Sequence, residues 1–142
     1  MQSTDLVHWE DMGTALKPDT PLDSHGAYSG SATVIDDQLF LMYTGNVRDE
    51  NWIRHPYQNG AWMDKNEKIQ KIDHPLIKAP DHVTEHFRDP QILKHADKYY
   101  AILGAQDKET NTGKLHCSTH QILRENGKIL NILISLIKIW AT

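Results

Sequence analysis

Polar and ionisable side chains crowd into one short stretch, TEHFRDPQIL, at residues 84–93. Within it, Arg88 and Asp89 stand directly before Pro90, and a guanidinium beside a carboxylate can hold the hydroxyl groups of a polyhydroxylated ligand. The same pair could instead be an ordinary strand entry with a local ion pair, because a residue that precedes proline favours extended backbone. These residues alone leave both interpretations open.

A zinc-site pattern overlaps this stretch. His82, Glu85 and His86 match H-x-x-E-H, which places two histidines and a glutamate on one face of a helix in some zinc peptidases. Prolines at positions 80 and 90 and two β-branched residues between them oppose a helix of useful length. We therefore predict two loop histidines, no metal site and no cofactor.

The surrounding elements read as strands. Runs rich in aromatic and β-branched residues lie at 28–35 and 38–45 and are joined by two aspartates that suit a tight turn. Runs at 91–94 and 98–105 repeat this arrangement. The sequence thus predicts two antiparallel hairpins.

The two hairpins suggest a weak repeat. Ser29 aligns with Arg88 at an offset of 59 residues (88 − 29), a spacing typical of β-propeller blades, which need neighbours to bury their faces. We predict an all-β chain, a partial five-bladed β-propeller of about two blades of antiparallel strands. Residues 46–59 are interpreted as a loop inside the first blade, and Trp62 and Met63 as the beginning of an outer strand.

Four motifs in order resemble a known family. They are STDLVHWE (3–10), YSGSA (28–32), YTGN (43–46) and TEHFRDP (84–90). Together they resemble the β-fructofuranosidases (invertases) of glycoside hydrolase family 32, and among them the bacterial sucrose-6-phosphate hydrolases. The resemblance extends over residues 3–114.

This resemblance implies a fold, a reaction and a site. Family members carry a five-bladed propeller followed by a β-sandwich and hydrolyse the fructosyl bond of sucrose or sucrose 6-phosphate with retention, which requires two carboxyl groups about 5–5.5 Å apart. Asp89 matches the family's transition-state stabiliser, and Arg88 would orient carboxyl groups. Tyr28, Ser29 and Gly30 would line the sugar site.

The sequence also departs from the family pattern. Neither the NDPNG motif that carries the nucleophile nor the ECP motif that carries the acid/base occurs in it, so we expect no hydrolysis by this chain alone. We interpret residues 1–114 as a propeller fragment and 115–142 as a divergent tail, as from a frameshift. The alternatives are a non-catalytic carbohydrate-binding propeller fragment and a related five-bladed glycosidase of arabinanase type.

Composition narrows the partners. The net charge of −4 and the scattered basic residues exclude the charge pattern of a nucleic-acid binder, and the apolar run at 129–140 is shorter than the about 20 residues of a membrane helix. A single cysteine and no recognisable signal peptide favour a cytoplasmic protein. Arg48, Arg54 and His55 could bind a sugar phosphate, although surface solubility explains them equally well.

Overall fold

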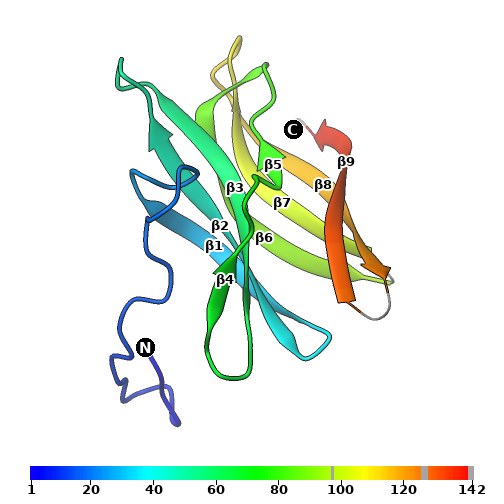
Figure 1. Cartoon of the computed structure of the whole chain (residues 1–142). Coiled ribbons are helices and arrows are strands. Elements are labelled where there is room, and N and C mark those ends of the chain that lie inside the picture. Colours follow the sequence, from blue (N-terminus) through cyan, green and yellow to red (C-terminus); the bar gives the residue numbers. More distant parts are fainter. Residues whose placement is uncertain (97, 126–127, 141–142) are drawn as a thin grey trace.

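The protein forms two antiparallel sheets, each following chain order (Figure 1). The computed structural model describes residues 1–96, 98–125 and 128–140, with side chains up to residue 118. The first sheet has the order β1-β2-β3-β4, with β5 paired to β3, and the second has the order β6-β7-β8-β9. The strands are β1 Ala27–Ile35, β2 Gln38–Arg48, β3 Arg54–Met63, β4 Ile69–Lys71, β5 Ile77–Lys78, β6 Val83–His95, β7 Lys98–Asp107, β8 Gly113–Glu125 and β9 Lys128–Trp140.

The first predicted hairpin is confirmed. β1 and β2 pair up to Ile35 and Gln38, and the turn consists of Asp36 and Asp37. Both aspartates have positive φ, 50° and 61°, as a two-residue hairpin turn of the type that matches strand twist requires. Aspartate tolerates this region better than most residues, which explains the two acidic side chains here.

The second hairpin is confirmed too, although its first strand is longer than predicted. β6 pairs with β7 up to His95 and Lys98, yet it begins at Val83. The H-x-x-E-H pattern therefore runs into a strand. His82 precedes β6, whereas His86 lies within it, so the prediction of two loop histidines is wrong for His86, and the two histidines share no helical face. Within the described residues no helix is long and apolar enough to cross a membrane.

The prediction of a loop over residues 46–59 is wrong. β2 continues to Arg48 and β3 begins at Arg54, so the connection is only residues 49–53. The strand pattern was hidden because the side chains buried here are polar: Asn46, Gln58 and Asn59 are each 0–1% exposed. Hydrogen bonds to other segments satisfy most of their polar atoms, which lets amide side chains replace apolar ones in these strands.

The predicted start of the outer strand at Trp62 and Met63 is also wrong. Both residues end β3, and the outer strand is the short β4 beyond the turn at residues 64–68. Trp62 packs against Phe40 of β2 with ring centroids 4.6 Å apart. This cross-strand aromatic pair belongs to the middle of the sheet.

The segment interpreted as a divergent tail contains the last two strands of the second sheet. β8 pairs with β7 from Tyr99 to Gln106, and β9 pairs with β8. The sequence indicated no strand in this apolar run because its apolar residues do not alternate. Pairing thus completes a four-stranded sheet, the usual content of a propeller blade.

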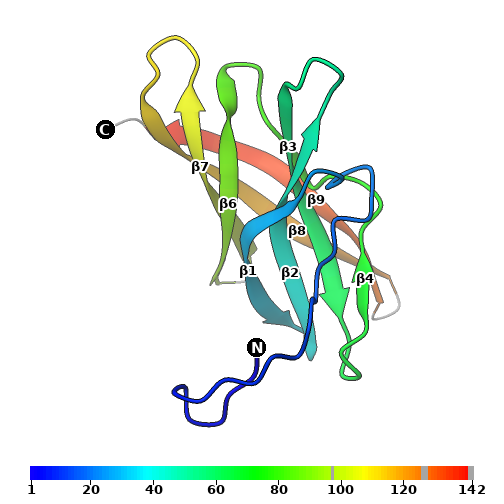
Figure 2. The same ribbon diagram turned by 90° about the vertical axis from the view of Figure 1, so that its left-hand side faces the viewer.

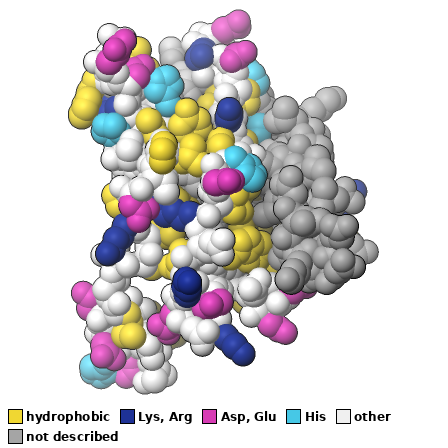
Figure 3. All heavy atoms as spheres, in the orientation of Figure 1, with side chains coloured by type: hydrophobic (Ala, Val, Ile, Leu, Met, Phe, Trp, Pro, Cys, Tyr) yellow, Lys and Arg dark blue, Asp and Glu magenta, His cyan; other side chains and the backbone are white. Residues whose placement is uncertain are grey.

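The inner strands β1 and β6 of the two sheets are neighbours (Figure 2), and the hydrophobic core between the sheets consists mainly of residues from β1, β2, β5, β6 and β7. The first sheet contributes Phe40 and Met42, and the second contributes Phe87 and Leu103, all at most 4% exposed. On the face drawn in Figure 3, apolar side chains gather in the middle, and charges of both signs are interspersed around them. Because the four core side chains named above belong to one buried cluster, each sheet buries a face against the other, as neighbouring blades do.

Candidate active site

The inner strands β1 and β6 lie side by side (Figure 2), and both are irregular at corresponding places. The register of β1 shifts between Tyr28 and Gly30. That of β6 shifts between Val83 and Phe87 and again between Arg88 and Gln91, and this second shift corresponds to the β1 shift at the 59-residue offset. Such β-bulges re-aim side chains and are frequent beside active sites. The two bulges hold the residues that sequence analysis assigned to the sugar site.

Asp89 occupies the bulge of β6 in an unusual conformation. Its φ is 61°, in the left-handed region, and its amide donates a hydrogen bond to Thr44 Oγ1 at 3.0 Å. Its side chain is 54% exposed and accepts no hydrogen bond from the described residues. The backbone is held while the carboxylate remains free to accept hydrogen bonds from a ligand.

Arg88 lies beside this carboxylate. Its Nε is 3.6 Å from Asp89 Oδ2, and its side chain is 43% exposed. An exposed pair at this distance stabilises a fold only weakly. The pair can therefore open toward a ligand at small cost.

Two buried residues that sequence analysis did not assign to the site hold the backbone of Asp89 through hydrogen bonds. Thr44 and Gln58 are 2% and 0% exposed, and Thr44 Oγ1 donates to Gln58 Oε1 at 2.9 Å. Gln58 Nε2 in turn donates to the carbonyl oxygen of Phe87 at 2.9 Å. Thr44 belongs to the YTGN motif, whereas Gln58 fell in the predicted loop, so no local signal linked them to Asp89.

Tyr28, Ser29 and Gly30 form the bulge of β1. All three are exposed, with Tyr28 at 40%, and the guanidinium of Arg54 lies over the Tyr28 ring at 5.9 Å from its centroid. A Cβ at Gly30 would lie 1.9 Å from the carbonyl oxygen of Met42. This bulge therefore requires glycine, and it exposes small groups beside an aromatic ring.

Of the three candidate phosphate-binding residues, Arg48 and His55 interact with other residues of the chain. Arg48 donates to the carbonyl oxygen of Trp52 at 2.7 Å and lies 5.1 Å from the Trp52 ring centroid. His55 Nε2 contacts Asp49 Oδ2 at 2.9 Å. Arg54 has no acidic partner among the described residues, and its buried Nε has no hydrogen-bond acceptor.

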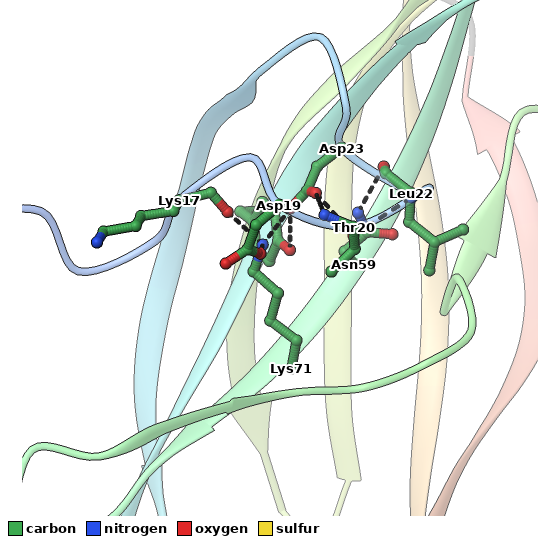
Figure 4. A network of polar contacts seen from close by, with 8 residues as sticks. Lys17, Asp19, Thr20, Leu22, Asp23, Asn59 and Lys71 are labelled. Atoms are coloured by element: carbon green, nitrogen blue, oxygen red, sulfur yellow. Dashed lines mark hydrogen bonds and ion pairs between the residues drawn. The ribbon is translucent and has the colours of Figure 1, made fainter.

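A polar network anchors the loop before β1 to the outer face of the first sheet (Figure 4). Asp23 is fully buried and accepts hydrogen bonds from Lys71 Nζ at 2.5 Å, Tyr43 Oη at 2.8 Å and Thr20 Oγ1 at 2.6 Å. Burial opposes ionisation of Asp23, but these donors outweigh it and lower its pKa. Burial and the Asp23 carboxylate raise the pKa of Tyr43 to about 12.

The second sheet has a different buried polar group. His116 on β8 is 1% exposed, and its Nε2 lies 2.8 Å from Ser118 Oγ. Its ring meets that of Phe87 edge to face at 5.0 Å. Burial lowers the pKa of His116, and His82 adds to this effect, so the imidazole is held neutral under the strand that carries Asp89.

Comparison with known proteins identifies the family. Residues 1–124 match the family described as the Glycosyl hydrolases family 32 N-terminal domain. The chain belongs to glycoside hydrolase family 32. Among curated proteins, it is 66% identical over 105 residues to the sucrose-6-phosphate hydrolase of Streptococcus mutans and 56% identical over 105 residues to that of Pediococcus pentosaceus.

Solved structures of two similar proteins share the fold. The sucrose-6-phosphate hydrolase of Lactobacillus gasseri superposes with a TM-score of 0.79 and 56% identity over 82% of this chain. A Bombyx mori β-fructofuranosidase mutant in complex with sucrose gives a TM-score of 0.64 and 27% identity over 89% of this chain. The predicted all-β partial propeller is confirmed.

The chain spans only part of the length of these relatives. The alignments cover 22% of the Streptococcus mutans protein and 21% of the Pediococcus pentosaceus protein, and 24% and 25% of the two solved chains. Among the described residues of this chain, no three potential metal-binding side chains cluster.

Proposed function

We propose that this chain forms part of the fructose-binding site of a retaining β-fructofuranosidase that hydrolyses sucrose or sucrose 6-phosphate. One observation carries the proposal: the inner strands of adjoining sheets bulge at corresponding places, and one bulge presents the half-exposed carboxylate of Asp89. In this role Asp89 accepts hydrogen bonds from sugar hydroxyl groups and stabilises the positive charge that develops on the ring. Arg88 orients it, and Tyr28, Ser29 and Gly30 line the site.

The chain alone binds the sugar without cleaving it. The family's nucleophile and acid/base motifs do not occur in this sequence, and a retaining mechanism needs both carboxyl groups. Incubation of the purified chain with sucrose or sucrose 6-phosphate should release neither glucose nor glucose 6-phosphate above the buffer control. Release that Asp89→Asn abolishes would overturn this part of the proposal.

Calorimetric titration with fructose tests the site itself. We expect Asp89→Asn to weaken binding by about tenfold or more, because the neutral amide loses charge-assisted hydrogen bonds. Asn keeps the side-chain shape and tolerates positive φ, so the fold should survive. Asp37→Asn makes the same change in the distant hairpin turn and should leave affinity unchanged; equal binding by both variants, or no binding by the unaltered chain, would refute the proposed site.

We assign recognition of a substrate phosphate to Arg54. Its guanidinium lies over Tyr28 and has no acidic partner among the described residues, whereas Arg48 and His55 are engaged. Arg54→Gln should reduce the ratio of the binding affinity for sucrose 6-phosphate to that for sucrose by about tenfold. Arg48→Gln is the matched control, and an equal loss in both variants would argue for a diffuse charge effect.

We place this function in the cytoplasm. The single cysteine, Cys117, allows no internal disulfide and so agrees with a reducing compartment. Cell fractionation of the source organism, followed by detection with an antibody against the chain, tests this placement; recovery from the culture medium would contradict it.

A further inference from the structure

The bulge of β6 leaves the backbone around Asp89 without support from its own sheet. On β6, Arg88 pairs with Gly104 and Gln91 with Ile102, so Asp89 and Pro90 fall between the paired positions. Pro90 has no N–H to offer, and the φ of 61° at Asp89 is a conformation that persists only where surrounding contacts impose it. The support must come from outside the second sheet.

The support is a closed chain of hydrogen bonds that starts and ends on β6. The Asp89 amide donates to Thr44 Oγ1 at 3.0 Å, the Thr44 hydroxyl donates to Gln58 Oε1 at 2.9 Å, and Gln58 Nε2 donates to the carbonyl of Phe87 at 2.9 Å. Phe87 and Asp89 are two residues apart on the same strand, while Thr44 and Gln58 belong to β2 and β3 of the first sheet. Two points on either side of Arg88 are thus tied to the neighbouring sheet.

The direction of these hydrogen bonds is determined by the backbone at both ends. A backbone amide can only donate, so Thr44 Oγ1 accepts from it and turns its own hydrogen toward Gln58. A backbone carbonyl can only accept, so the Gln58 amide nitrogen faces Phe87 and its oxygen faces Thr44. A Gln58 amide in the opposite orientation would set two acceptors face to face in a buried place, which is costly.

We infer that Thr44 and Gln58 are positioning residues for Asp89, an inference that rests on the proposed function. The Asp89 carboxylate accepts no hydrogen bond from the described side chains, so its direction follows from the backbone that carries it. The chain from Gln58 through Thr44 fixes that backbone, and with it the point at which the carboxylate meets the sugar. Neither Thr44 nor Gln58 touches the substrate, since both are buried.

The first experiment replaces the Thr44 hydroxyl with a methyl group of similar size. Thr44→Val leaves the buried Asp89 amide and Gln58 oxygen unpaired, so we expect exchange of the Asp89 amide hydrogen to accelerate by about tenfold or more and fructose binding to weaken by about tenfold. Thr44→Ser keeps the hydroxyl and should stay within about twofold of the unaltered chain. Thr33→Val is the control on β1, because the Thr33 hydroxyl makes no hydrogen bond with the described residues.

The second experiment uses Gln58→Glu. At pH 8 the introduced carboxylate would face the Phe87 carbonyl without a donor, whereas at pH 5 burial favours its neutral form, which can donate to that carbonyl. Fructose binding by this variant should therefore recover toward that of the unaltered chain measured at the same pH as the pH falls from 8 to 5, a comparison that separates the effect from the titration of His116, whose ring packs against Phe87. A change that only disturbs packing would not recover in this way.

The outcomes separate this inference from the proposed function. If the unaltered chain binds no fructose, the proposed function fails, and Asp89 amide exchange in Thr44→Val and Thr44→Ser still decides the positioning role. Unchanged exchange and unchanged affinity in Thr44→Val would overturn the inference. If all amides of Thr44→Val exchange rapidly, the variant has unfolded, and Thr44→Ser with the pH series of Gln58→Glu decides: recovery supports the inference and its absence overturns it.

Discussion

The bulges of β1 and β6 occupy corresponding places in neighbouring sheets but depend on different physical support. The bulge of β1 closes against its own sheet, where Gly30 lies so near the carbonyl of Met42 that any Cβ would clash. The bulge of β6 depends on the other sheet: the amides of Asp89 and Ile92 donate to the hydroxyls of Thr44 and Ser31, each at 3.0 Å.

The comparison shows how a charged side chain can be placed at an irregular strand. Steric closeness makes the first bulge compact but excludes a side chain at its centre. Hydroxyl groups from the adjoining sheet hold the second bulge and leave room for a carboxylate. The residue with the proposed role in chemistry thus depends on contacts between sheets, and the residues that line the site depend on contacts within one sheet.

The largest expected effect is that of Gly30→Ala. The added Cβ would lie 1.9 Å from the Met42 carbonyl oxygen, so the two strands must separate, and we expect the free energy of unfolding to fall by about 3 kcal/mol. Gly104→Ala is the matched control opposite Arg88 in the second sheet, where the nearest atom to a new Cβ is an ordinary 3.7 Å away. Urea denaturation followed by circular dichroism measures the stability of both variants. Equal stabilities would refute the claim that the bulge of β1 requires glycine for steric reasons.

Asp23→Ala should have the next largest effect. It leaves Lys71 and Tyr43 without their buried acceptor, and we expect a loss of about 2 kcal/mol, reduced because Lys71 keeps its contact with Asp19. Asp19→Ala removes an acid whose side chain is 63% exposed and should cost less than about 0.5 kcal/mol. Chemical denaturation decides, and a similar loss in both variants would show that burial of Asp23 is unimportant.

Ser31→Ala tests the contact between sheets with a smaller change. The Ile92 amide would lose its acceptor, so we expect a loss of about 1 kcal/mol and faster exchange of the Ile92 amide hydrogen. Ser29→Ala, in the same strand, removes a hydroxyl without a hydrogen bond to the described residues and should leave that exchange unchanged. Slow exchange of the Ile92 amide in Ser31→Ala would mean that the bulge of β6 does not depend on the hydrogen bond to Ser31.

The last expected effect is a difference in pH response between the sheets. His116 has a lowered pKa in the folded state, so the unfolded chain binds the proton first, and stability falls as the pH drops below about 6.5, by at most about 1.4 kcal/mol per pH unit. Tyr43 has a pKa raised to about 12, so its contribution is present below pH 10 and is lost as the pH rises from 10 to 12. Denaturation curves at pH 5.5, 7.5 and 11 check both.

Substitution of each titrating group assigns these two pH responses. His116→Gln should remove the dependence below pH 6.5 and leave the alkaline loss. Tyr43→Phe should reduce the alkaline loss, to which Lys71 also contributes because its pKa is raised in the fold, and should leave the acid loss. An acid dependence that persists in His116→Gln would place its origin outside the second sheet's buried histidine.

Sequence patterns predicted the parts of the fold that depend on neighbouring residues. Asp36 and Asp37 marked the first hairpin because a tight turn needs residues that tolerate positive φ. β3 was missed for the opposite reason: Gln58 and Asn59 look like loop residues, and only partners far along the chain make their burial possible. The motif around Asp89 identified the carboxylate but not Thr44 and Gln58, which hold its backbone in place.

The amino-acid sequence alone therefore determined the hairpins, the family and the carboxylate that we place in the sugar site. Tertiary structure decided how that carboxylate is held, because Thr44 and Gln58 reach β6 across 45 and 29 residues of chain. Turns and strand periodicity arise from interactions within a few residues. A buried hydrogen bond between sheets exists only after the sheets have packed, so no local sequence pattern predicts it.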